Sequence, residues 1–250
     1  MLEKMKMNNV DIFDFVEPNI NWTTKLNIEA AKVVRRINKQ QFIMQTSTSE
    51  EYSESHNKRG GTLLCATNRM TGRFATKSSD PRGLGRWTTM SIIGRNQKMI
   101  HIVCLYRVSQ EQSKGDQTSY MQQIRLLKQQ GITNPNPRQQ VLDDLDKMLQ
   151  QWQDENNDII LMMDANSNLQ DRALTQVLHK HKLNDALGIH HGYNQPPTYA
   201  RGTRTIDYIF CSECIIDSIS KCGILPYNEL ILSDHRALFI DIDINKAFKG

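Results

Sequence analysis

The interpretation of the whole chain starts from one stretch, Asp158-Ile-Ile-Leu-Met-Met-Asp164-Ala-Asn166-Ser-Asn168. Its run of apolar residues between two aspartates is typical of a strand buried on both faces. Such a strand delivers Asp164 at its C-terminal end, and Asn166 points the same way if the extended conformation continues. A carboxylate beside a neutral amide can hold a hard cation or a phosphate. The alternative is an Asx-turn that closes the strand through its own backbone.

Other short apolar runs predict further strands, with helical patterns between them. The predicted strands are residues 10–16, 42–45, 62–66, 87–93, 99–105, 159–163, 206–211 and 238–244. Apolar residues at helical spacing predict a helix over 26–37 and another after Pro137, and residues 46–61 have the composition of a loop. Strands outnumber helices and several neighbours resemble hairpins. This pattern favours an α/β sandwich, in which two sheets pack face to face with helices outside.

The length and composition suit one domain over residues 1–250. The chain is 38% hydrophobic and 23% charged, which is enough apolar material for one core and unlike a disordered chain. No apolar run approaches the length of a membrane span, and the first residues lack the apolar stretch of a secretory signal. Five cysteines without an evident pairing are typical of a reducing compartment. We therefore expect an intracellular protein with no membrane partner, nuclear or cytoplasmic.

The net charge of +4 combines two segments of opposite sign. Residues 58–107 carry ten basic residues and one acid, whereas residues 141–164 carry seven acids and one lysine. A cluster of cations favours a polyanionic partner, because binding releases phosphate counterions. The alternative is that these charges interleave on the folded surface with acids from elsewhere in the chain.

Two further motifs combine carboxylate and imidazole. In residues 203–208, TRTIDY, Asp207 enters an apolar strand, where an ionised carboxylate needs a partner. That partner is either a nearby arginine, Arg201 or Arg204, or a histidine that Asp207 orients. In residues 232–236, LSDHR, Asp234 and His235 are adjacent just before the last strand. His235 can titrate near neutral pH, and Asp234 can bind a metal or tune the imidazole.

The order of these motifs resembles the endonuclease/exonuclease/phosphatase superfamily, which includes deoxyribonuclease I and the apurinic/apyrimidinic endonucleases. Residues 11–19, DIFDFVEPN, resemble the family motif in which a strand ends in a metal-binding glutamate, here Glu17. Residues 101–107, HIVCLYR, resemble the strand that ends in a phosphate-contacting tyrosine, here Tyr106. The resemblance runs from about residue 10 to the C-terminus. The stretches at 83–87, 122–123 and 136–145 are similar to endonuclease domains of non-LTR retroelements.

This resemblance implies a four-layer αββα sandwich, in which two packed mixed sheets are flanked by helices. The family begins with a strand that carries a metal-binding asparagine, well before the glutamate. Only 16 residues precede Glu17, so we expect a domain that is truncated at its N-terminus and lacks the first strand. A second departure from the family pattern is Met163, where the family has glycine. We expect the bulk of this side chain, close to the phosphate, to affect activity.

The resemblance also implies roles for individual residues. Asp164 would align or deprotonate the attacking water, Asn166 would hold the scissile phosphate, and His235 would stabilise charge on the phosphate while Asp207 sets its tautomer. Tyr106 would contact the phosphate or assist the leaving oxygen. The implied metal ligands are Glu17 and Asp234, for Mg²⁺ or alternatively Mn²⁺. The candidate substrate-binding residues beside these motifs are Arg107, Asn168, Arg204 and Ser233.

The function implied is that of a metal-dependent phosphodiester hydrolase, in the first place an endonuclease that cuts or nicks DNA. The chemistry is consistent with the residues, because attack on an anionic phosphodiester needs a cation to offset repulsion and a base to remove a proton. Two alternatives remain: a phosphoesterase for a small molecule or lipid, and a catalytically impaired remnant that still binds nucleic acid.

Overall fold

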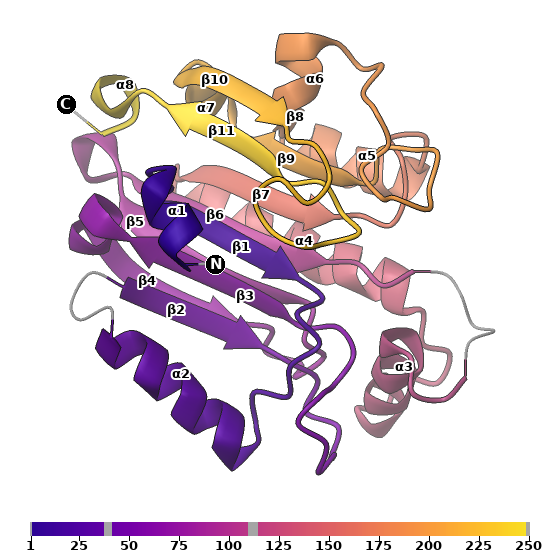
Figure 1. The fold of residues 1–250 in the computed structure, drawn as a ribbon. Coiled ribbons are helices and arrows are strands. Elements are labelled where there is room, and N and C mark those ends of the chain that lie inside the picture. Colours follow the sequence, from indigo (N-terminus) through magenta and orange to yellow (C-terminus); the bar gives the residue numbers. More distant parts are fainter. Residues whose placement is uncertain (1, 38–41, 110–114, 249–250) are drawn as a thin grey trace.

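A six-stranded sheet forms the inner layer that carries the candidate site residues (Figure 1). The computed structural model describes residues 2–37, 42–109 and 115–248. The strand order in this sheet is β4-β5-β6-β7-β9-β8. Its strands are β4 (Phe74–Ser79), β5 (Trp87–Ile93), β6 (Met99–Tyr106), β7 (Asp158–Asp164), β8 (Asn184–Asp185) and β9 (Asp207–Cys211). β6 and β7 run parallel and every other pair is antiparallel, so the sheet is mixed.

A second layer lies on one face of this sheet and is divided into two parts. One part is a three-stranded sheet in the order β1-β3-β2, and the other is the pair β10-β11. These strands are β1 (Ile12–Val16), β2 (Phe42–Ser47), β3 (Thr62–Thr67), β10 (Ile219–Ile224) and β11 (Leu238–Ile242). In the described part of the chain, no strand is hydrogen-bonded between β1 and β11.

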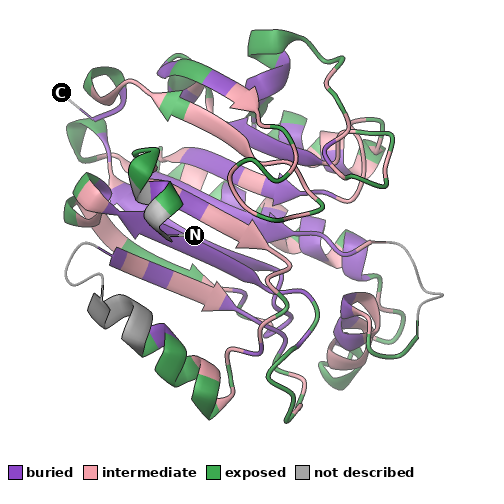
Figure 2. Cartoon of the chain, in the orientation of Figure 1, coloured by how far each residue is buried: buried purple, intermediate pink, exposed green. Residues whose placement is uncertain are grey.

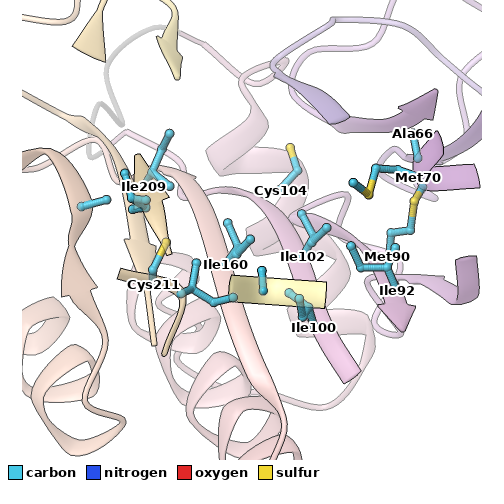
Figure 3. Close-up of a cluster of buried hydrophobic side chains, with 14 of the residues drawn as sticks. Ala66, Met70, Met90, Ile92, Ile100, Ile102, Cys104, Ile160, Ile209 and Cys211 are labelled. Carbon is cyan, nitrogen blue, oxygen red and sulfur yellow. The ribbon is translucent and has the colours of Figure 1, made fainter. Parts of the chain in front are cut away.

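The main hydrophobic core fills the space between the two layers (Figure 3). Leu64 and Ala66 of β3 meet Met90 of β5 and Ile102 of β6, and all four are almost fully buried. Figure 2 shows that β3 and the central strands of the six-stranded sheet are mostly buried, whereas β1 and β11 are mostly of intermediate exposure. Alternate residues of each strand face this core, so its composition follows from the two-residue period of the strands.

Helices cover the outer faces of both layers. Leu142, Leu145 and Leu149 of α4 (Pro137–Asp154) form a second core with Val103 of β6 and Leu161 of β7. The Asn136 side chain accepts a hydrogen bond from the Gln139 amide at its start, with proline in the first turn, which explains why α4 begins there. The remaining helices are α1 (Leu2–Met7), α2 (Lys25–Ile37), α3 (Ser119–Gln129), α5 (Arg172–Lys180), α6 (Ala186–His191), α7 (Glu213–Ile216) and α8 (Ile244–Phe248), with 3₁₀ turns at Asn68–Arg73 and Arg95–Gln97.

The predicted sandwich of two helix-flanked sheets is confirmed, and the predicted strands are present with small changes of boundary. The prediction for residues 238–244 was wrong at its end, because β11 stops at Ile242 and α8 begins at Ile244. The Asp243 carboxylate there accepts a hydrogen bond from the Asn245 amide, which favours a helical start. The strands β4, β8 and β10 were not predicted, since they are short or largely polar.

The basic stretch at residues 58–107 does not form one open patch. Arg86 and Arg107 are buried in ion pairs, and Lys58 is buried with its ammonium on backbone carbonyls. Arg82 and Lys98 pair with Asp144 and Asp158 of the acidic stretch. The structure therefore agrees with the alternative in which the two charged stretches interleave. Within the described residues, no helix has the length and apolar character that crossing a bilayer requires.

One buried ion pair ties β5 to α4 close to the strand ends. The Arg86 guanidinium bonds Asp80 at 2.7 Å and Asp144 at 2.8 Å, and the side chains of Arg86 and Asp80 are both fully buried. The Arg86 carbonyl also accepts the backbone amide of Tyr106 at 2.8 Å. The Arg86–Asp80 ion pair therefore holds the backbone to which Tyr106, a candidate site residue, is hydrogen-bonded.

Replacing Arg86 by leucine should destabilise the protein strongly, because Asp80 is left as an uncompensated buried charge. The expected loss is about 3–5 kcal/mol of unfolding free energy, measured by urea denaturation. Lys32→Ala is the matched control. It removes an exposed pair with Glu29, so the expected change is below about 1 kcal/mol. Equal effects of the two substitutions would contradict the structural role of Arg86.

Candidate active site

Three adjacent strands of the six-stranded sheet place polar side chains side by side at one end. Tyr106 at the end of β6 is opposite Asp164 at the end of β7, and Asp164 is opposite Asp207 at the start of β9. The alignment follows from direction, since β6 and β7 are parallel and β9 is antiparallel to β7. All three side chains belong to buried residues. Motifs separated by about a hundred residues of sequence therefore meet at a single edge of the sheet.

His235 reaches this edge from the segment before β11 and pairs with Asp207. The Nδ1 atom of His235 lies 2.9 Å and 3.1 Å from the two carboxylate oxygens of Asp207. The Ser233 hydroxyl accepts the backbone amide of His235, and the Tyr199 ring lies 5.0 Å from the imidazole. Asp207 therefore has a histidine as its partner, which decides between the alternatives that the sequence leaves open.

Asn166 lies beside Asp164 in a left-handed backbone conformation, with φ of 45°. Its backbone amide donates to one Asp164 carboxylate oxygen at 2.9 Å, and its side-chain amide donates to the other at 3.1 Å. The same side-chain amide also donates to the Arg107 carbonyl at 2.8 Å. The Asx-turn that the sequence allows is therefore present, and it keeps Asn166 next to the carboxylate.

Glu17 approaches the same edge from the second layer. It follows β1 with a φ of 50°, and its backbone amide donates to the Gly61 carbonyl. Its carboxylate accepts a hydrogen bond from the Tyr106 hydroxyl. Burial raises the pKa of Glu17, an effect that the hydrogen bond from Tyr106 partly offsets. Burial, followed by the nearby Glu17 carboxylate, likewise raises the pKa of the Tyr106 phenol.

The crowding of carboxylates perturbs the titration of the site. Burial and the neighbouring charge of Asp207 raise the pKa of Asp164. Burial lowers the pKa of His235, but the hydrogen bond and charge of Asp207, with the charges of Asp164 and Asp234, outweigh it and raise the pKa to about 9. A cluster of acids with an imidazole whose cation is stabilised is typical of a functional site.

Metal-ligand spacing is found within this cluster. The oxygens of Asp164 and Asp207 and a ring nitrogen of His235 lie within 4.8 Å of one another. Glu17 adds a further carboxylate on the other side of Tyr106. Asp234, in contrast, lies at the rim, is half exposed and pairs with Arg201 at 3.1 Å. Closely spaced carboxylates repel one another, and a divalent cation offsets this repulsion, so these donors fit the hard ion that the sequence resemblance implies.

The four candidate substrate-binding residues lie in different surroundings. Arg107 is buried and pairs with Asp171 at 2.6 Å. Asn168 bonds within its own turn to Gln170, and Ser233 supports the backbone of His235. Arg204 is exposed on the loop before β9. Of the four, Arg204 is therefore the one whose side chain is presented to solvent.

Sequence reasoning did not single out several residues that the fold brings to the site. Thr198 accepts the backbone amides of Ile206 and Asp207 on its hydroxyl, which holds the start of β9. Asp171 pairs with Arg107 and also caps α5. Asp14 of β1 faces the Cys104 thiol between the layers. Of these residues, Asp14 could have been found from the sequence, because it is an acid in the middle of the apolar run 12–16.

Asp207→Asn should lower the pKa of His235, because the substitution removes its largest stabilising partner while burial remains. The expected fall from about 9 is on the order of 2 units, measured by NMR titration of the imidazole. The pair should stabilise the fold fully below pH 6.5 and lose that contribution as the pH rises through 9. Asp234→Asn, at the exposed rim, is the control with a smaller expected shift. A pKa unchanged in Asp207→Asn would contradict this arrangement.

Asp14→Asn should stabilise the protein at high pH. Burial raises the pKa of Asp14 to about 6, so folding favours its neutral form. The contribution of Asp14 to stability is complete below about pH 4 and is lost as the pH rises through 6. Urea unfolding at pH 8 should show a gain on the order of 2–3 kcal/mol, with little difference at pH 4. Asp154→Asn, at an exposed position, is the control and should show no such pH dependence. If the stability change in Asp14→Asn were equally independent of pH, a buried Asp14 carboxylate would be excluded.

Three solved structures illustrate the proteins whose fold this chain shares. An AP endonuclease from Archaeoglobus fulgidus is 16% identical, with a TM-score of 0.64, over 98% of this chain and 93% of that one. The 3′ phosphatase NExo from Neisseria, bound to product DNA hairpin, is 14% identical, with a TM-score of 0.64, over 97% and 93%. The endonuclease domain of TRAS1, a telomere-specific non-LTR retrotransposon, is 15% identical, with a TM-score of 0.51, over 96% and 90%.

Neither a family model nor a curated protein matches the sequence. Identities of 14–16% establish a shared fold and leave the activity and the retroelement placement as predictions. The alignment covers nearly the whole chain, and the layers are those that the motifs imply. The chain therefore has the fold of the endonuclease/exonuclease/phosphatase superfamily.

Proposed function

We propose that this protein is a metal-dependent phosphodiester hydrolase and, more specifically, an endonuclease that nicks DNA. The observation that carries the proposal is the cluster at one end of the sheet of two buried aspartates, Asp164 and Asp207, with the partly buried His235. A general base, a histidine that becomes cationic and an orienting carboxylate are the groups that phosphodiester hydrolysis needs. Their convergence from distant parts of the sequence supports a site more strongly than any one motif.

Each group has a position that suits its proposed role. Burial and the charge of Asp207 raise the pKa of Asp164, so its carboxylate is a stronger proton acceptor for an attacking water than an exposed aspartate is. Asp207 accepts from Nδ1 of His235, and Nε2 is then the nitrogen that faces a phosphate oxygen. Asn166 holds the Asp164 carboxylate in place through two hydrogen bonds and would contact the scissile phosphate when substrate binds.

A divalent cation, Mg²⁺ or Mn²⁺, would offset the charge of the phosphate and lower the pKa of the attacking water. Glu17 is the proposed ligand within the site, because Mg²⁺ prefers one or two carboxylates completed by waters. Asp234 would contribute from the rim once it leaves Arg201. Asp164 and Asp207 are the alternative oxygen donors, since they have the spacing of metal ligands.

DNA is the proposed substrate class because one of the similar structures is a 3′ phosphatase bound to product DNA hairpin, and two others are an AP endonuclease and a retrotransposon endonuclease domain. The exposed Arg204, beside the start of β9, would contact the backbone phosphates. A small-molecule or lipid phosphoester is the alternative substrate. A catalytically impaired protein that binds nucleic acid is favoured by one observation, the division of the second layer beside Glu17.

Supercoiled plasmid nicking tests the proposal. Mg²⁺ should support nicking and EDTA should abolish it. Asp164→Ala and His235→Ala should each lower the rate by about 10²–10⁴-fold, the contribution of a positioned acid–base group. The matched controls are Asp154→Ala and His190→Ala, the same residue types at exposed positions, which should leave the rate unchanged.

Nicking that survives substitution of Asp164 and His235 would contradict the site. Hydrolysis of bis-p-nitrophenyl phosphate that excess DNA does not inhibit would favour the small-phosphoester alternative. DNA binding without nicking, at unchanged affinity in Asp164→Ala, would favour the impaired nucleic-acid-binding protein.

A further inference from the structure

Two buried arginines lie next to the turn that carries Asn166. Arg107 follows Tyr106 at the end of β6, and Arg138 belongs to the first turn of α4. Their exposed fractions are 4% and 9%. Arginine is seldom buried without an anionic partner, because removing its charge from water is costly. Arg138 has no role in the hydrolysis proposed above, so its burial beside the site calls for a separate explanation.

Asp171 is shared unequally by the two guanidinium groups. Its Oδ2 atom lies 2.6 Å from Nη1 of Arg107 but 3.6 Å from Nη2 of Arg138. The other oxygen, Oδ1, accepts the amides of Ala173 and Leu174 at the start of α5. Within the described residues, no second carboxylate forms an ion pair with either arginine. The cluster therefore holds two cations and one anion, and one positive charge lacks a direct partner.

Arg138 bridges the segments that follow β6 and β7. Its Nη1 atom donates to the Val108 carbonyl at 2.6 Å, and its Nη2 atom donates to the Asn166 carbonyl at 3.4 Å. The φ of 45° at Asn166 lies in the left-handed region, which is uncommon for a residue other than glycine. A planar guanidinium makes two such bonds at once in a fixed geometry, unlike a lysine ammonium. Arg138 therefore supports the backbone of the residue that is proposed to contact the phosphate.

The surplus charge is unfavourable for folding. Burial, followed by the like charge of Arg107, lowers the pKa of Arg138 to about 10, although nearby acidic side chains act in the opposite direction. A base whose pKa is lowered by folding carries its charge at a cost to stability. Residues that reduce stability in this way are found at functional sites, where the charge serves binding. A phosphate on Asn166 is an anion that would compensate the surplus charge.

We propose that Arg138 is a positioning residue of the candidate site, which fixes the turn of Asn166 and, with Arg107, supplies the positive charge that an anionic phosphate on Asn166 compensates. The guanidinium and the phosphate need not touch, since charges in a protein interior interact over longer distances than in water. The inference rests on the proposed function, because it takes a phosphodiester as the ligand of Asn166. It adds α4 to the elements that build the site.

Paired substitutions separate a structural arginine from a functional one. Arg107→Gln should lower the urea midpoint of unfolding, because Asp171 loses its closest cation. Arg138→Gln should leave the midpoint unchanged or raise it, because Arg107 keeps its partner and the like-charge repulsion is gone. A midpoint that Arg138→Gln lowers as far as Arg107→Gln does would show an ordinary structural residue and would overturn the proposal.

Hydrogen exchange measures the turn itself and requires no activity. The Asn166 amide bonds the Asp164 carboxylate, so loosening of the turn exposes this amide to solvent. In Arg138→Gln its exchange should be at least about tenfold faster than in the parent protein. The adjacent Ala165 amide, which bonds the Ile206 carbonyl, is the internal control and should be unchanged. Equal exchange of the Asn166 amide in the two proteins would overturn the positioning role.

Plasmid nicking tests the charge. The value of kcat/KM should fall on the order of 10²-fold in Arg138→Gln and about tenfold in Arg138→Lys, which keeps the charge without the planar fork. Lys147→Gln removes an exposed cation from the same helix and should leave kcat/KM unchanged. Equal losses in Arg138→Gln and Arg138→Lys, or no loss in either, would overturn the proposal. If the parent protein does not nick DNA, the proposed function fails, and the exchange and unfolding experiments still decide whether Arg138 positions the turn.

Discussion

The hydrogen-bonded register of β6, β7 and β9 determines where every group of the candidate site lies. It aligns Tyr106, Asp164 and Asp207 on three adjacent strands, at separations that backbone pairing keeps within a few ångströms. Because a slip of one residue would turn a side chain to the opposite face, the register is held by the cores on both faces of the sheet. The site is thus a consequence of packing that is unrelated to its chemistry.

The cost of this arrangement is electrostatic. Asp164, Glu17 and Asp14 are carboxylates with raised pKa values, and burial is the largest cause in each case. Hydrogen-bonding partners reduce the cost of burying these carboxylates. His235 pairs with Asp207, Tyr106 with Glu17, and the amides of Asn166 with Asp164. A concentration of poorly compensated acids is unfavourable for stability but suits a site that takes a cation and a proton.

The second layer is divided next to the candidate site. Glu17 follows β1 and His235 precedes β11, so the two facing edge strands both adjoin the site.

Much of the fold and part of the site could be predicted from local pattern. The apolar runs predicted β5 with the bounds that the structure shows. The acids at strand ends identified Asp164 and Asp207 as candidates, and the adjacent Asp234 and His235 before the last strand identified His235. β4 was missed because Phe74–Ser79 is mostly polar, being an edge strand with little core contact. Tyr199 and Thr198 were missed because they act through contacts with distant residues, for which no local signal exists.

The sequence by itself determined which segments are strands, which ends carry acids, and that the motifs resemble one superfamily. These properties depend on side-chain type and on periods of two or about four residues, which are local. Only the tertiary structure decided that Asp207 pairs with His235 and not with an arginine, that several cations of the basic stretch pair with acids, and that β1 and β11 face each other unpaired. These are properties of residues that meet in space after long separations in sequence, and chain topology and packing determine which of them meet.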